Sequence, residues 1–145
     1  MKEQPTRILV CDDSDTLRLS TMRFLNQFDS FEVIANTRSG QEAIDCSRTL
    51  KPDVVIMDIE MPKMNGIEAS IYIKTELPDT VIIMFSSADD DFSIFKSLAS
   101  GADGYCTKRL ATNLPSIIRE SRHRSPDING NTQRSTSTLS KTLSF

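Results

Sequence analysis

Polar side chains that could handle a charged group follow four apolar segments of the sequence, each at the point where the segment ends. They are Asp12 and Asp13, Asp58, Ser86 and Lys108. Three carboxylates brought close together would repel one another strongly, so a divalent cation is expected between them. Oxygen ligands select a hard ion, and a few carboxylates with water suit Mg²⁺. Lys108 adds a positive charge and Ser86 a hydroxyl donor, so the set could bind a phosphoryl group and allow Asp58 to accept it.

Each of these residues, taken alone, also has an ordinary structural interpretation. Asp12 and Asp13 could cap a helix, and Asp58 could be a loop acid. Ser86 could lie in a turn, and Lys108 could be a solvated side chain at a strand end. Their joint occurrence at successive strand ends favours a shared site.

Five short apolar segments alternate with segments of helical periodicity. Strands are expected at residues 7–11, 31–35, 54–57, 80–85 and 104–108, and helices are expected to begin near Ser14, Ser39, Gly66, Asp89 and Asn113. This alternation predicts an α/β fold with a doubly wound, five-stranded parallel sheet. The usual order for this size is the flavodoxin-like (βα)5 order 2-1-3-4-5. Strands 1, 3, 4 and 5 then end at one crevice, where the polar residues would meet.

The spacing of apolar residues predicts which side of each helix faces the sheet. The residues expected there are Leu17, Thr21, Phe24, Leu25 and Phe28 in the first helix, Ala43, Ile44, Ser47 and Leu50 in the second, Ile67 and Ile71 in the third, Phe92, Phe95, Leu98 and Ala99 in the fourth, and Ile117 and Ile118 in the last. The second strand is mixed in character, as an edge strand can be. Ser39 and Glu42 match a capping box that opens the second helix.

The chain has 145 residues, enough for one domain of ordinary size and too few for two. We expect a domain over residues 7–122, a short extension at residues 1–6 and a disordered Ser/Thr-rich tail at residues 123–145. A net charge of -3 argues against non-specific nucleic-acid binding. The sequence shows neither a membrane-length apolar run nor a leader, which predicts a cytoplasmic protein. The three cysteines are expected to be buried free thiols.

The sequence from residue 7 to residue 122 resembles the receiver (CheY-like) domain of two-component response regulators. The motifs that carry the resemblance are Cys11-Asp12-Asp13-Ser14, Met57-Asp58-Ile59-Glu60-Met61-Pro62, Phe85-Ser86-Ser87 and Gly101-Ala102-Asp103-Gly104-Tyr105-Cys106-Thr107-Lys108. The resemblance implies a phosphoacceptor with autocatalytic phosphotransfer and autodephosphorylation, rather than an enzyme. A histidine kinase or a phosphotransfer protein would supply the phosphoryl group.

The resemblance also implies a role for each site residue. Asp58 would accept the phosphoryl group; Asp12, Asp13, Asp58 and the backbone carbonyl of Glu60 would hold Mg²⁺; Ser86 and Lys108 would bind the phosphoryl oxygens; Tyr105 would turn inward on activation; and the side chains of Glu60 and Ala88 would tune the lifetime of the phosphoryl group. A downstream protein would dock on the face formed by the fourth helix, the fifth strand and the last helix. A phosphorylation-dependent homodimer is a further expectation, whereas direct contact with nucleic acid or membrane is not expected.

Two departures from the family pattern stand out. Arg109 occupies the position after the lysine, where the family usually has proline, often with a cis bond, so a trans and differently shaped loop is expected there. Ser87 replaces a common alanine. Two other functions remain open: the regulatory domain of a transcriptional regulator whose DNA-binding domain is missing, and a phosphatase similar to haloacid dehalogenases. The phosphatase is disfavoured because such enzymes have a second Asp where this chain has Glu60.

Overall fold

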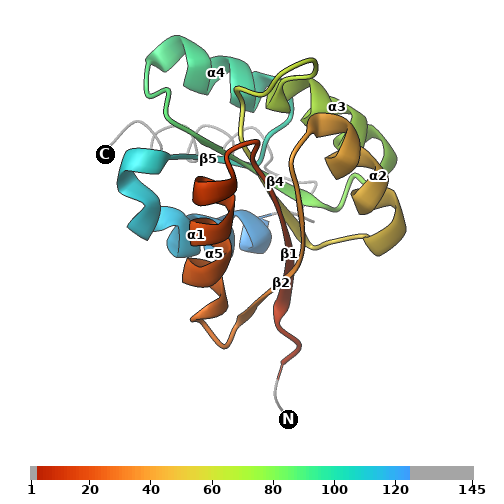
Figure 1. The fold of residues 1–145 in the computed structure, drawn as a ribbon, viewed down its shortest axis with the longest axis vertical. Coiled ribbons are helices and arrows are strands. Elements are labelled where there is room, and N and C mark those ends of the chain that lie inside the picture. The colour runs from red at the N-terminus through yellow and green to blue at the C-terminus, as the bar shows by residue number, and fades with distance from the viewer. Residues whose placement is uncertain (1–2, 125–145) are drawn as a thin grey trace.

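A computed structural model describes residues 3–124 of the chain, and these residues form a parallel sheet between two layers of helices (Figure 1). The strands are β1 (Thr6–Cys11), β2 (Phe31–Thr37), β3 (Val54–Met57), β4 (Val81–Ser86) and β5 (Gly104–Thr107). The helices are α1 (Asp15–Asn26), α2 (Gly40–Leu50), α3 (Gly66–Glu76), α4 (Asp91–Ala99) and α5 (Leu114–Arg124), and a 3₁₀ helix, η1 (Lys108–Asn113), joins β5 to α5. The tail was predicted to begin at residue 123, but α5 continues to Arg124; the rest of the predicted tail, from residue 125 on, lies outside the described residues.

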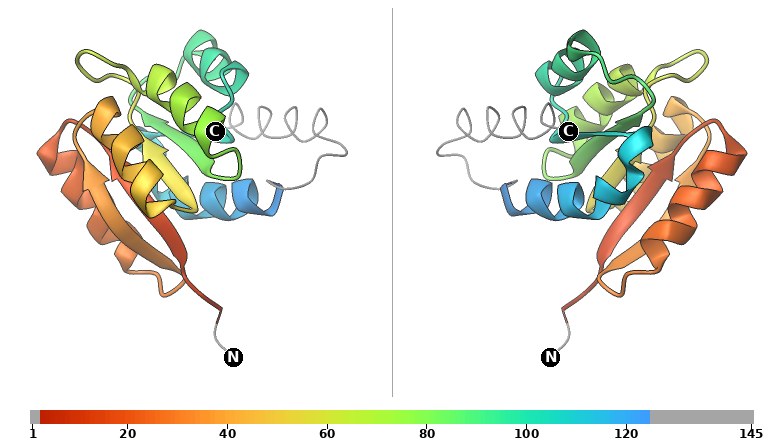
Figure 2. Two further views of the ribbon diagram at one scale, coloured as in Figure 1. Left: turned by 90° about the vertical axis from the view of Figure 1, so that its right-hand side faces the viewer. Right: turned by 90° about the vertical axis from the view of Figure 1, so that its left-hand side faces the viewer.

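The sheet has the predicted order β2-β1-β3-β4-β5, with every neighbouring pair parallel. β2 lies at one edge, as expected. Helices α2, α3 and α4 cover one face and α1 and α5 cover the other, as the two views of Figure 2 show. Alternate residues of β1 enter the two cores, Ile8 and Val10 on one side and Leu9 and Cys11 on the other. This double burial explains why the strands read as continuous apolar runs.

The strand register places the last residues of β1 and β3, which directly precede Asp12 and Asp58, side by side in the sheet. Cys11 pairs with Met57, and Met57 pairs with Met84. The residues that follow these strands therefore leave the sheet at one edge.

Side-chain caps begin four of the helices close to the predicted positions. The hydroxyl of Ser39 accepts a hydrogen bond from the backbone N–H of Glu42, as the capping box requires. Ser14 caps α1, Asn65 caps α3 and Asp90 caps α4 in the same way. Gly101, with a φ of 109°, directly follows Ser100, the C-cap residue of α4.

The predicted buried sides of α3 and α4 were partly wrong. In α4, Phe92 and Phe95 are 73% and 60% exposed, and Ala99 is also exposed, while Ile94 and Ser97 are fully buried. Apolar residues lie on both sides of this helix, so their spacing alone does not choose between the sides. In α3, Ile71 is exposed, while small residues such as Ala69 face inward. The reason is the close approach of α2, because a Cβ at Gly40 would lie only 3.1 Å from that of Ala69.

Smaller corrections concern α1 and the strand ends. Leu17 was predicted to face the sheet but is exposed, because the next residue, Arg18, takes the inward position. β2 extends two residues further than predicted, to Thr37, because its last residues pair with β1. β5 ends one residue earlier than predicted, because Lys108 already belongs to η1, a 3₁₀ helix that the sequence did not predict.

Three further findings bear on the class of protein. None of the helices within residues 3–124 is long and apolar enough to cross a membrane. Cys11, Cys46 and Cys106 are free thiols, as predicted. Cys11 and Cys106 are buried as expected, whereas Cys46 is only partly buried. Burial raises the pKa of Cys11 and of Cys106 to about 12. These two thiols are therefore protonated and unreactive at neutral pH.

Candidate functional site

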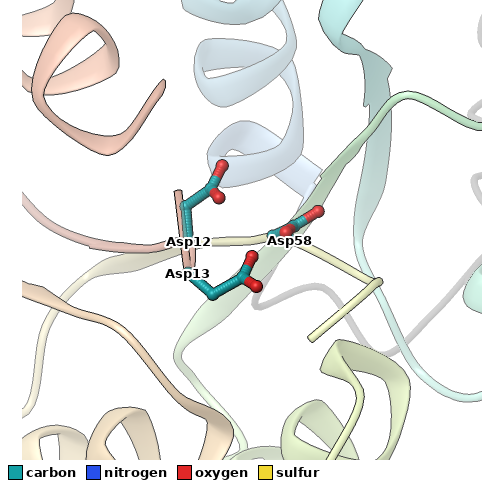
Figure 3. A group of neighbouring side chains, drawn as sticks. All are labelled: Asp12, Asp13 and Asp58. Atoms are coloured by element: carbon teal, nitrogen blue, oxygen red, sulfur yellow. The ribbon is translucent and has the colours of Figure 1, made fainter. Parts of the chain in front are cut away.

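Three carboxylates meet at the carboxyl edge of the sheet. Asp12 and Asp13 follow β1, and Asp58 follows β3 (Figure 3). One oxygen of each carboxylate lies within 4.8 Å of the others. Asp12 and Asp58 are buried, and Asp13 is exposed. The predicted convergence of the three acids is confirmed, and such a set of hard oxygen donors has the composition that Mg²⁺ prefers.

Lys108 supplies positive charge to this acidic pocket. Its Nζ donates hydrogen bonds to Asp12 Oδ2 at 2.8 Å and to Asp58 Oδ1 at 3.2 Å. The same nitrogen lies 6.0 Å from the centre of the Phe85 ring. Burial lowers the pKa of Lys108, but the hydrogen bond to Asp12 and the charge of Asp58 outweigh this effect, so the net pKa lies above its usual range. Lys108 is therefore a fixed cation at neutral pH.

Asp58 binds a proton more tightly than an ordinary aspartate does. Its burial raises the pKa to about 6, and the charges of Asp12 and Asp13 add to this increase while Lys108 opposes it. A further cation beside Asp58 would favour its charged form.

The backbone around Asp58 leaves no room for a side chain at Gly66. The N–H of Gly66 donates to the carbonyl of Ile59 at 2.8 Å, which closes the loop between β3 and α3. A Cβ at Gly66 would lie only 2.0 Å from the carbonyl oxygen of Asp58. Glycine is required there because the start of α3 touches the peptide that carries the acid.

The other predicted residues form a second group beside the acids. Ser86 is buried at the end of β4, and its Oγ accepts a hydrogen bond from the N–H of Ala88 at 3.2 Å. The hydroxyl of Tyr105 donates to the carbonyl of Ala88, and the ring is fully buried. The side chain of Glu60 is exposed. The structure thus links Ser86, Ala88 and Tyr105 to one another, and Lys108 to the acids.

A family model decides which kind of site this is. Residues 8–118 match the model of the response regulator receiver domain. The chain belongs to the response regulator receiver family. A receiver is a phosphoacceptor of two-component signalling, and an acidic triad like this one is typical of the Mg²⁺-binding site of receivers. Receivers interact with histidine kinases and with downstream targets.

Individual relatives place the receiver among response regulators. It is 32% identical over 117 residues to the response regulator protein VraR of Staphylococcus saprophyticus, covering 80% of this chain and 56% of VraR. It is 36% identical over 107 residues to the transcriptional regulatory protein LnrK of Bacillus subtilis, covering 74% of this chain and 49% of LnrK. The receiver therefore spans about half the length of these curated relatives.

Solved structures agree with this placement. The response regulator domain of Thermotoga maritima CheB superposes with a TM-score of 0.78 at 31% identity, covering 85% of this chain and all of that one. A LuxR-family response regulator from Aurantimonas superposes with a TM-score of 0.80 at 26% identity, covering 95% of this chain and 97% of the other.

Arg109, the residue that departs from the family pattern, pairs with the loop after β4. Its Nη2 lies 3.1 Å from Asp89 Oδ2, and both side chains are exposed. Within residues 3–124 the structure has no cis peptide bond, in agreement with the trans loop expected here.

Sequence reasoning missed one residue of the receiver site, Arg18. This residue lies on α1, is only 3% exposed, and contacts the backbone of Asp12. The signal was available, because Arg18, Thr21 and Leu25 follow one another at helical spacing on the buried side of α1. A charged residue within such a series indicates a buried polar partner.

Proposed function

We propose that this receiver is phosphorylated on Asp58 by a histidine kinase or a phosphotransfer protein, in a reaction that requires Mg²⁺. The observation that supports this most strongly is the position of Lys108, which is hydrogen-bonded to two of three carboxylates that lie within 4.8 Å of one another. A site that balances three acids with one lysine has an excess of negative charge, which a divalent cation would neutralise.

The proposed roles of the pocket residues follow from their positions. Asp12, Asp13, Asp58 and the backbone carbonyl of Glu60 would hold Mg²⁺, whose charge would neutralise oxygens of the phosphoryl group. Lys108 would release Asp58 and bind one phosphoryl oxygen. The hydroxyl of Ser86 would donate a hydrogen bond to another.

Asp58 acts in this proposal as the nucleophile. A carboxylate oxygen of Asp58 attacks the phosphorus of the phosphohistidine, an O–P bond forms, and the P–N bond breaks. The imidazole nitrogen keeps the electron pair of the broken bond and takes up a proton from solvent. Because the pKa of Asp58 is about 6, this residue is deprotonated in most receiver molecules at neutral pH, as the reaction requires. The side chains of Glu60 and Ala88 flank the site and would tune how fast water removes the phosphoryl group.

Movement of Ser86 would carry the signal to the output face formed by α4, β5 and α5. Ser86 is hydrogen-bonded to the N–H of Ala88, whose carbonyl accepts the hydroxyl of Tyr105 on β5. A shift of Ser86 toward the phosphoryl group would therefore alter the contact of Tyr105 with the loop before α4. Phe92 and Phe95 on α4 are large exposed apolar side chains that a downstream protein or a second receiver could bury.

Intact-mass detection of phosphorylation by a small-molecule acyl phosphate, with and without Mg²⁺, tests this proposal. We expect one phosphoryl group per chain with Mg²⁺ and none without it. Asp58→Asn should abolish the adduct, whereas the matched control Asp79→Asn, which changes an exposed acid beyond the sheet's other end, should leave it intact. An adduct that persists in Asp58→Asn would contradict the assignment. Size-exclusion chromatography of both forms then distinguishes self-association from partner docking.

A second candidate is the regulatory domain of a transcriptional regulator. LnrK is named as a transcriptional regulatory protein, and the receiver matches about half of its length. In this role, phosphorylation would control an attached DNA-binding domain rather than a separate partner. Phosphorylation-dependent dimerisation of the chain would favour this candidate, and a phosphorylated form that stays monomeric would favour a relay or docking role.

A further inference from the structure

A buried arginine lies directly behind the acidic pocket. Arg18 is only 3% exposed, although charged side chains are almost never fully buried unless they are paired. Its planar guanidinium carries five N–H donors in a fixed arrangement, so it can hold several acceptors in defined directions at once.

The guanidinium of Arg18 connects three segments that meet beside the pocket. Its Nε donates to Asn36 Oδ1 at 2.8 Å, near the end of β2. One terminal nitrogen donates to the carbonyl oxygen of Asp12 at 3.0 Å, and the other donates to Asp15 Oδ1 at 2.7 Å in the first turn of α1. A single side chain therefore ties the loop that carries Asp12 and Asp13 to β2 and to α1.

The hydrogen bond to the Asp12 carbonyl matters most, because that carbonyl belongs to the peptide group that leads into Asp13. The rest of Asp12 is already held: its N–H donates to Thr37, and its carboxylate accepts from the N–H of Ser14 and from Lys108. Asp13 is exposed, unlike the other two acids. Because burial does not hold the side chain of Asp13, the orientation of its peptide group sets the direction in which this side chain leaves the backbone.

We propose that Arg18 is a positioning residue of the receiver site, which orients Asp13 through the peptide group between Asp12 and Asp13 and thereby sets the affinity for Mg²⁺. This inference rests on the proposed function, in which Asp13 is a ligand of the ion. Partners that orient metal ligands typically contribute about 10- to 100-fold to metal affinity. Lysine cannot replace arginine here, since a single ammonium does not reproduce three contacts in fixed directions.

A purely structural role makes a different prediction from a positioning role. If Arg18 only tied segments together, its replacement would lower stability, but the folded molecules would bind Mg²⁺ as before. If Arg18 orients Asp13, the folded variant binds Mg²⁺ more weakly, and saturating Mg²⁺ restores phosphorylation of Asp58. The concentration of Mg²⁺ needed for half-maximal rate would then change, and the maximal rate would not.

Mg²⁺ titration of the ¹⁵N-labelled chain, followed by NMR, measures this affinity directly in a protein that lacks tryptophan. We expect Arg18→Lys to bind Mg²⁺ about 10- to 100-fold more weakly than the native chain. Arg48→Lys is the matched control, because Arg48 also forms a forked contact, with Glu76 at 2.6 and 2.7 Å between α2 and α3. The control should keep native affinity. A folded Arg18→Lys with native affinity for Mg²⁺ would overturn the inference.

Asn36→Ala provides a second test that does not depend on the stability of the Arg18 variant. Asn36 is exposed, so its truncation leaves the core intact while removing one of the three acceptors. We expect affinity for Mg²⁺ to fall roughly threefold, consistent with the loss of one hydrogen bond. If Arg18→Lys does not fold, unchanged affinity in Asn36→Ala overturns the inference. A native chain that does not bind Mg²⁺ overturns the proposed function as well, whereas native binding that neither variant changes overturns only the role of Arg18.

Discussion

The two sides of the receiver site are held in very different ways. On the acid side, Asp12 and Asp58 are buried, and hydrogen bonds fix the backbone of both. On the side that we propose acts as the switch (the switch side: Ser86, Tyr105 and the loop 87–90 between β4 and α4), Ser87, Asp89 and Asp90 are exposed. Two side chains from the region of β5 contact this loop, Tyr105 through the Ala88 carbonyl and Arg109 through Asp89.

This difference suggests that the acid side binds the ion and the phosphoryl group, while the loop between β4 and α4 changes its conformation in response. Groups that stabilise charge work best when they are already in place, because no energy is then spent on moving them. A segment that must respond should instead be held by few contacts, since a ligand shifts an equilibrium only by its differential affinity for the two states. Four substitutions test whether the contrast is real.

Of the four substitutions, Gly66→Ala, on the acid side, should lower the stability of the fold most. The added methyl would lie 2.0 Å from the Asp58 carbonyl oxygen, so we expect the free energy of unfolding to fall by about 4 kcal/mol or more. Urea denaturation measures this loss. Gly101→Ala is the control, because no atom lies within 4 Å of its Cβ and only its positive φ opposes alanine, at a cost of about 1 kcal/mol. Equal losses in the two variants would show that close packing beneath Asp58 is not the reason for glycine.

Asp58→Asn, on the acid side, should change how the free energy of unfolding of the chain depends on pH. Asp58 has a pKa of about 6 in the fold and an ordinary value of 3.8. The folded state therefore holds this proton more tightly than the unfolded state, so the group's contribution to stability is complete below about pH 4 and is lost as the pH rises through about 6. The loss amounts to about 3 kcal/mol. In the presence of a chelator, the stability of Asp58→Asn relative to the native chain should rise by that amount between about pH 4 and pH 7.

Urea denaturation across this pH range measures the effect of Asp58→Asn. The control Asp79→Asn, at an exposed position, should follow the native pH profile. A constant difference between Asp58→Asn and the native chain would mean that burial does not perturb Asp58.

On the switch side, Tyr105→Phe should have a smaller effect. The variant loses the hydrogen bond to the Ala88 carbonyl, which contributes about 1 kcal/mol, but it keeps the buried ring. NMR should show shifts confined mainly to residues 86–90, with unchanged affinity for Mg²⁺. Tyr72→Phe, on the exposed surface of α3, is the control and should change neither property. A loss of Mg²⁺ affinity in Tyr105→Phe would mean that the two sides are not independent.

Arg109→Ala should have the smallest effect of the four. Its ion pair with Asp89 is exposed, and such pairs contribute roughly 0.5 kcal/mol or less and weaken as salt is added. Thermal unfolding at low and high salt measures this contribution. A salt-independent loss well above that value would show that the switch side is held as firmly as the acid side.

The sequence predicted the fold and the acid side well because both depend on local signals. Apolar strands and capping residues give the order of elements, and Asp12 and Asp58 each directly follow a strand. The side of α4 that faces the sheet could not be chosen, since Phe92 and Phe95 compete with Ile94 at similar spacing. The helical spacing of Arg18 with Thr21 and Leu25 indicated a buried position, but its partners, Asn36 among them, could not be predicted because they come together only when β2 lies beside β1.

The ion pair between Lys108 and Asp12 also has a consequence for the order of events during synthesis. The two residues are 96 positions apart in the chain and 2.8 Å apart in the fold. A growing chain that has formed β1 to β3 would carry all three acids without their lysine. Chains fold as they leave the ribosome from the N-terminus onward, and contacts between distant residues form late. The three acids of the receiver would therefore gain their balancing lysine only after the fifth strand has joined the sheet.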